Sequence, residues 1–154
     1  MGSKGSLLIV YHSQSGNTEQ LAAAVEEGAR RVPNAQVSIL PAARMDSGLL
    51  QHCSVLVICS PEYFGYMAGA IKDFFDRTYE QTREFTIGKP YVAIISAGND
   101  GTGALTSIER IVAGYRMRKV QEPIIHRGKI TEDALSRCRE LGQTLAAGID
   151  LGIY

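Results

Sequence analysis

The sequence predicts an α/β protein, a three-layer sandwich whose central sheet has five parallel strands in the order 2-1-3-4-5. Short apolar runs of strand length alternate along the chain with longer segments whose apolar residues recur at helical spacing. This alternation indicates parallel strands, because each parallel connection needs a crossover, which is usually a helix. With 154 residues, the chain is expected to form a single domain over residues 1–154, with residues 1–6 as a flexible leader.

Three strands are predicted to be buried, because their apolar runs are continuous and a strand covered on both faces has no polar side. They are residues 7–11, 54–60 and 91–96. Residues 36–40 alternate between apolar and polar side chains, and residues 120–125 form a weaker run that polar residues interrupt. These last two strands are therefore expected near the edges of the sheet.

Helices are predicted between the strands from the spacing of apolar residues. The expected helices are one from Thr18 that ends at residues 32–34, a short one near Leu50, one over Met67–Thr78, one over about 105–115, and one from about Thr131. The last of these has a strong start signal, since Thr131 can cap the helix and two acidic residues follow in its first turn.

The composition excludes several classes of protein. Sixteen basic residues balance sixteen acidic ones, which argues against a nucleic-acid-binding protein and against a strongly acidic docking protein. No apolar run approaches the ~20 residues of a membrane helix, and no signal peptide is recognisable. Cys53, Cys59 and Cys138 have no CxxC spacing, so they are expected to be reduced packing residues in a cytoplasmic protein. A redox role for Cys59 near a ligand is the less favoured alternative.

The loop after the first strand, HSQSGNT at residues 12–18, has the strongest functional signal. In parallel α/β sheets, ligands bind beyond the carboxyl ends of the strands. Hydroxyl and amide side chains here, with backbone N–H groups at a helix N-terminus, can bind an anion without any Lys or Arg. The plainer interpretation is a helix cap, but one capping residue would suffice for that. An anion site built from neutral dipoles is therefore favoured.

Other motifs of this topology are absent. The chain has neither GxxxxGK[ST] nor a GxGxxG after the first strand, so a nucleoside triphosphatase and a Rossmann NAD site are not supported. A receiver domain would need acidic residues after the first strand and at the end of the third, and residues 12–13 and 59–60 contain none. The first loop also lacks the Cys nucleophile of a low-molecular-weight tyrosine phosphatase.

The first strand and loop resemble the flavodoxin signature, which the chain matches at Ile9, Val10, Tyr11, Ser13, Gly16, Thr18, Ala22 and Val25. Flavodoxins bind flavin mononucleotide (FMN). The resemblance therefore implies a flavodoxin-like fold and an FMN phosphate bound by Ser13, Gln14, Ser15, Gly16, Asn17 and Thr18.

The second loop resembles the flavin loop of NAD(P)H:quinone oxidoreductases of the tryptophan-repressor-binding-protein type, through Pro61, Phe64, Gly65, Met67 and Gly69. In that family, the backbone of this loop binds the edge of the isoalloxazine. The third loop is similar only in its small, Gly-rich character. By this resemblance, the ring is expected against Pro61, Glu62, Tyr63, Phe64, Gly65, Ser96, Ala97, Gly98, Asn99 and Asp100. Aromatic stacking by Tyr63, Phe64 or Tyr66 is also expected.

Two departures from the electron-carrying flavodoxins favour an enzyme. The net charge is zero, whereas those carriers are typically acidic, and residues 96–104 contain no aromatic side chain to cover the flavin. We expect an oxidoreductase that passes electrons from NAD(P)H through FMN to a quinone-like acceptor. The alternative is a one-electron carrier between redox partner proteins. Residues 116–119 could meet an NADPH phosphate or simply end a helix, and the apolar residues 151–154 suggest a homodimer.

Overall fold

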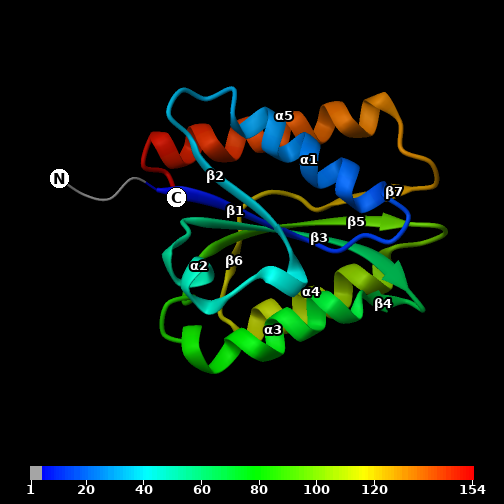
Figure 1. Ribbon diagram of the computed structural model, residues 1–154, viewed down its shortest axis with the longest axis horizontal. Helices are drawn as coiled ribbons and strands as arrows, with labels where there is room; N and C mark the ends of the chain where they lie inside the picture. Colours follow the sequence, from blue (N-terminus) through cyan, green and yellow to red (C-terminus); the bar gives the residue numbers. More distant parts are fainter. Residues whose placement is uncertain (1–4) are drawn as a thin grey trace.

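In the computed structural model, which describes residues 5–154, one sheet lies between two layers of helices (Figure 1). Helices α1 (Asn17–Ala29) and α5 (Glu132–Asp150) cover one face of the sheet. The other face is covered by α2 (Ser47–His52), α3 (Gly69–Thr82) and α4 (Thr102–Gly114). The predicted three-layer α/β class is therefore confirmed.

The order of the main strands also matches the prediction. The sheet has the order β2-β1-β3-β5-β6, with β7 also paired to β5 and with a short β4 paired to β3. The strands are β1 (Ser6–Tyr11), β2 (Gln36–Pro41), β3 (Val55–Tyr63), β4 (Tyr66–Met67), β5 (Pro90–Ala97), β6 (Arg118–Lys119) and β7 (Ile124–Arg127). A single turn of 3₁₀ helix, Ala42–Arg44, follows β2. All pairings are parallel except that of β3 with β4.

The fifth predicted strand, residues 120–125, is wrong in its bounds. The chain instead forms β6 and β7, which pair with different parts of β5. Pro123 explains the break, because proline has no N–H to donate to a sheet ladder. Over residues 5–154, the sheet thus has seven strands instead of five.

Several other boundaries differ from the prediction. The first helix, α1, ends at Ala29 and not at residues 32–34, and α4 begins at Thr102 instead of about residue 105. The third helix begins at Gly69 and not at Met67, because Met67 belongs to β4 and pairs with Glu62 of β3. Of the expected leader, residues 1–4 lie outside the described residues, whereas Ser6 already belongs to β1 and pairs with Gln36. The backbone N–H of Ser6 also donates to Ser54 Oγ at 3.1 Å.

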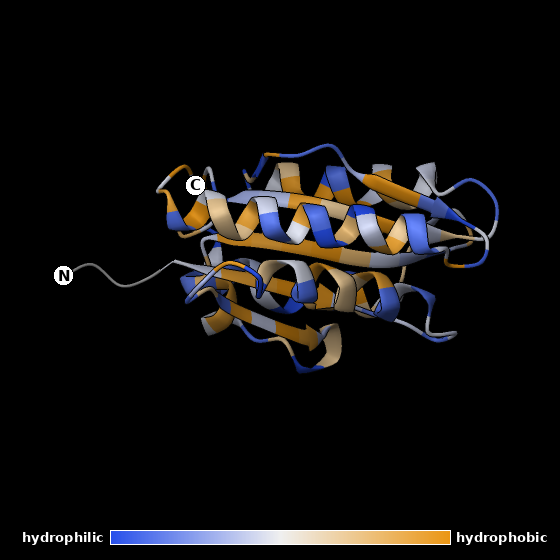
Figure 2. Ribbon diagram, turned by 90° about the horizontal axis from the view of Figure 1, so that it is seen from above, coloured by the Kyte–Doolittle hydropathy of each residue, from blue (hydrophilic) through white to orange (hydrophobic). Residues whose placement is uncertain are grey.

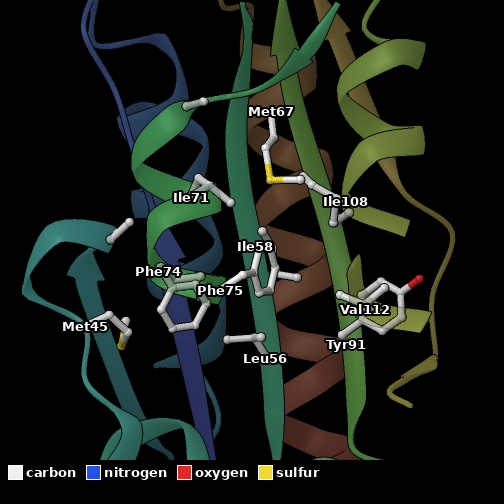
Figure 3. Packing of buried hydrophobic residues seen from close by; sticks show 14 of the residues in the cluster. Met45, Leu56, Ile58, Met67, Ile71, Phe74, Phe75, Tyr91, Ile108 and Val112 are labelled. Carbon is white, nitrogen blue, oxygen red and sulfur yellow. The ribbon is translucent and has the colours of Figure 1, made fainter. Parts of the chain in front are cut away.

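The core consists of two apolar clusters, one on each face of the sheet. Figure 2 shows the apolar residues concentrated on the strands and on the helix faces that meet them. In Figure 3, Phe74 and Phe75 of α3 pack beside Ile58 of β3, and each of these residues is at most 1% exposed. Burying such a side chain contributes about 1.5–3 kcal/mol. Within residues 5–154, no helix has both the length and the apolarity to cross a membrane.

Candidate functional site

The three predicted loops meet at one edge of the sheet because the strands before them are parallel and in register. Tyr11 at the end of β1 pairs with Cys59 of β3, and Pro61, further along β3, pairs with Ser96 of β5. A pocket of about 280 Å³ lies beyond these strand ends. It is lined by Gln14, Ser15, Asn17, Thr18, Pro61, Glu62, Tyr63, Ser96, Ala97, Gly98 and Gly128.

The first loop contributes uncapped backbone donors to this pocket. Gly16 precedes α1 in the left-handed region, at φ 95°, where a side chain would be strained. Its N–H donates to Ser13 Oγ at 3.0 Å, and no side chain among the described residues caps the helix. The first residues of α1, Asn17 and Thr18, line the pocket, so the free N–H groups of the first turn of the helix lie at the pocket wall. The capping interpretation of this loop is wrong for the structure.

The second loop is a β-hairpin. Tyr63 of β3 pairs with Tyr66 of β4, and the two residues of the turn between them, Phe64 and Gly65, have φ of 54° and 71°. Positive φ at both central positions is typical of a type I′ turn, in which Asn-Gly is preferred and Phe is unfavourable. Phe64 projects fully into solvent at the tip. Tyr63 lines the pocket, with the ring of His12 edge-on to it at 6.3 Å between centroids.

Glu62 binds the start of α4 with both carboxylate oxygens. Oε1 accepts from the N–H of Gly101 at 2.9 Å, and Oε2 accepts from the N–H of Ala104 at 3.0 Å. Glu62 is also one of the residues that line the pocket. Glu62 was expected to bind the cofactor through its loop, and the structure gives its carboxylate a different set of partners on α4.

The third loop divides into two parts. Ser96, Ala97 and Gly98 line the pocket, and a Cβ added at Gly98 would meet no atom within 4 Å. Asp100 instead turns toward β7, where Arg127 Nε donates to its backbone oxygen at 2.7 Å. Arg127 Nη2 also lies 3.9 Å from Asp100 Oδ1. The loop therefore offers the pocket a small backbone surface and not a charged side chain.

The structure brings most of the predicted site residues together, with some exceptions. The predicted residues that do not line the pocket are Ser13, Gly16, Phe64, Gly65, Asn99 and Asp100. Sequence reasoning missed Gly128, which follows β7 and whose N–H donates to Ala97 O at 2.9 Å. A glycine directly after a strand at this edge of the sheet was the available signal, but the predicted strand ended at residue 125, too early to reveal it.

Two further candidate groups, Cys59 and the basic residues 116–119, do not line the pocket. Cys59 is 0% exposed, and burial raises the pKa of its thiol well above the ordinary value, so the packing interpretation is correct. Arg118, within the basic cluster at residues 116–119, pairs with Pro90 at the start of β5. The pocket lies beyond the other end of that strand, about 25 Å away at the rise of a β-strand.

The pocket fits a ligand with an anionic tail and a flat body. Of the described residues that line it, none is Lys or Arg, so an anion would be bound by hydroxyl, amide and backbone N–H dipoles. Tyr63 supplies an aromatic surface, and burial raises the pKa of its phenol, which keeps it neutral. Gly98 and Gly128 leave room for a planar group to approach the backbone.

Comparison with known proteins agrees with this geometry. A family model described as NADPH-dependent FMN reductase matches residues 45–132, more than half of the chain. A flavodoxin from Clostridium saccharobutylicum is 24% identical over 149 residues, which cover 90% of this chain and 93% of that protein. An NAD(P)H dehydrogenase (quinone) from Chromohalobacter salexigens is 28% identical over 171 residues, which cover 94% of this chain and 84% of that protein. A solved flavodoxin from the domain Archaea has a TM-score of 0.80 at 24% identity and covers 94% of this chain and 99% of its own. The resemblance drawn from the first two loops is confirmed.

Proposed function

Because the chain belongs to the NADPH-dependent FMN reductase family and is a flavoprotein with FMN as its cofactor, we propose that FMN binds in the pocket at the strand ends. The convergence of the segments 14–18, 61–63 and 96–98 at one edge of the sheet carries this proposal. Under this proposal, the described residues form a single flavodoxin-like domain that binds FMN.

Each part of the pocket has its own task in this proposal. The first-turn N–H groups of α1, with the side chains of Ser15, Asn17 and Thr18, bind the phosphate. Ser13 holds Gly16 in the conformation that exposes those donors. Tyr63 would offer an aromatic surface to the ring, and the backbone at residues 96–98 would offer polar groups to it. FMN itself supplies the capacity to accept a hydride when it is bound. The role of the protein is to bind FMN and to orient it.

We further propose that the protein is an oxidoreductase that takes electrons from NAD(P)H and passes them to a quinone-like acceptor. The absence of an aromatic side chain in residues 96–104 leaves one side of the ring accessible to a flat reactant. The similarity to a quinone dehydrogenase over 94% of the chain also supports this activity. The free cysteines support the cytoplasmic setting. A homodimer stays a prediction, supported by the exposure of Leu151 and Ile153 near the C-terminus.

A one-electron carrier is the second candidate. The specific observation in its favour is the similarity to a flavodoxin across 90% of this chain and 93% of that protein. A carrier needs no nicotinamide site, because it receives electrons from a partner protein.

Stopped-flow mixing of the FMN-loaded protein with NADPH and, separately, with NADH distinguishes the two functions. Rapid loss of flavin absorbance with either nucleotide alone is the expected result for the oxidoreductase. Reduction only after a partner reductase is added would refute the enzymatic proposal and favour the carrier. Reoxidation by a soluble quinone, monitored in the same instrument, tests the acceptor class.

A further inference from the structure

The second and third loops of the pocket are joined by one carboxylate. Glu62 lies on β3, immediately before the hairpin turn, yet both of its oxygens accept from backbone N–H groups at the start of α4. Those groups belong to Gly101 and Ala104, so the carboxylate connects the hairpin to the end of the third loop. Hydrogen bonds to a charged acceptor are among the stronger contacts in proteins.

Two more contacts hold the hairpin against α4. The N–H of Met67 donates to Ser107 Oγ at 3.0 Å, and Ser107 is buried. The backbones also approach closely, because a Cβ added at Gly103 would lie 2.2 Å from the carbonyl oxygen of Gly65. The hairpin and the first turns of α4 therefore form one packed unit at the side of the pocket.

We propose that Glu62 is a positioning residue that fixes the third loop against the hairpin and sets the electrostatic potential at the ring of the bound cofactor. This inference rests on the proposed placement of FMN in the pocket that Glu62 lines. A carboxylate capping α4 is favourable in itself, because a helix N-terminus attracts negative charge. Reduction of a flavin adds negative charge to the ring system, and a fixed carboxylate in the wall of the pocket disfavours that form.

The variants separate position from charge. Glu62→Gln keeps the size of the side chain, but its NH₂ group must face one of the two backbone N–H donors. Ser107→Ala loosens the same hairpin without changing any charge. Glu84→Gln is the control for the loss of one negative charge, since Glu84 is exposed on the turn after α3. Glu62→Ala is a more severe fourth variant.

The first readout is hydrogen exchange of the Gly101 and Ala104 amides in the protein without FMN. Glu62→Gln should raise the exchange rate of at least one of the two amides by about tenfold, whereas Glu84→Gln should leave both unchanged. The second readout is the pair of dissociation constants for oxidised and reduced FMN. Both Glu62→Gln and Ser107→Ala should weaken the binding of oxidised FMN. Only Glu62→Gln should raise the ratio of the oxidised to the reduced constant, by about three- to tenfold.

Unchanged amide exchange in Glu62→Gln would overturn the positioning role. A ratio that stays constant in Glu62→Gln, or that moves as far in Ser107→Ala, would overturn the electrostatic role. If Glu62→Ala fails to fold, the isosteric Gln variant still decides both points. Failure of the unaltered protein to bind FMN would refute the proposed function instead, and the exchange experiment would still test the connection between the loops.

Discussion

Replacement of Asn17 by Ala together with Thr18 by Val should remove most of the preference of this protein for FMN over riboflavin. Both residues line the pocket at the N-terminus of α1, where no side chain of the described residues caps the helix. Their side chains are hydrogen-bond donors, and riboflavin has the same ring as FMN without the phosphate. Under the proposed phosphate site, the double substitution removes donors that only FMN would use.

The magnitude follows from the type of bond. A hydrogen bond to a charged acceptor contributes about 1.5–3 kcal/mol, so two such donors contribute about 3–6 kcal/mol to phosphate binding. At about 1.4 kcal/mol per tenfold change, FMN affinity should fall by roughly two to four orders of magnitude. Thr18 is 1% exposed, and Val fills the same volume, so the substitution leaves no cavity. The backbone N–H groups of α1 remain, which keeps some affinity for the phosphate.

Quenching of flavin fluorescence during titration measures both affinities. The riboflavin constant is the internal control and should change little, while the FMN constant rises. Thr106→Val is a matched control on α4, because Thr106 is exposed and does not line this pocket. A double variant that keeps the FMN-to-riboflavin preference of the unaltered protein would refute the assignment of the phosphate to this loop.

Three other perturbations test separate parts of the structure. In Gly98→Leu, the new side chain should project into the open pocket and occupy the space that FMN needs. FMN affinity should fall by about 5- to 150-fold, which corresponds to an overpacking cost of ~1–3 kcal/mol. The control Gly114→Ala should leave FMN binding unchanged in the same titration. Phe64→Asn should raise the free energy of unfolding in urea by about 0.5–1 kcal/mol, because Asn tolerates the left-handed conformation and Phe64 is fully exposed; no gain would contradict the strain. Burial raises the pKa of Cys53 and of Cys138 from 9.0 to about 11, so these thiols lose their protons at a lower pH in the unfolded chain than in the folded protein. The free energy of unfolding should therefore keep its full value below about pH 9 and fall as the pH rises toward 11. In urea titrations at several pH values, Cys138→Ala should show a shallower decline, and an unchanged slope would contradict this cause.

The sequence predicted the layers and the strand order because these depend on long apolar patterns. Residues 54–60 and 91–96 have no polar side, and both form strands in the middle of the sheet. The edge was harder, since β6 and β7 are short and Pro123 separates their pairing with β5. No periodicity can be read from two residues, so Arg118–Lys119 could only be assigned once β5 was in place beside it.

The candidate site was predictable where local sequence fixes local backbone. Gly16 and the polar residues after β1 determine a loop conformation that needs few long-range contacts. Glu62 was not predictable in the same way, because its partners at residues 101 and 104 lie about forty positions further along the chain. The hairpin turn at Phe64 was also missed, since Phe is an unfavourable residue for a left-handed position and pattern reasoning assigns it elsewhere.

A phosphate site without a cation depends on where its dipoles are held, because each N–H group acts only over a short distance. Here the position of α1 is fixed by contact with α5 at the backbone level. A Cβ at Gly28 would lie 1.8 Å from the carbonyl oxygen of Arg139, and one at Gly142 would lie 1.9 Å from that of Val25. Gly28 is about 16 Å along the helix from Asn17, yet any side chain there would have to push α1 away from α5 and displace the donors with it. Under the proposed phosphate site, the specificity of the first loop for an anion would depend partly on these two glycines, which do not line the pocket. Because none of the described residues that line the pocket is Lys or Arg, the packing of α1 against α5 would matter more.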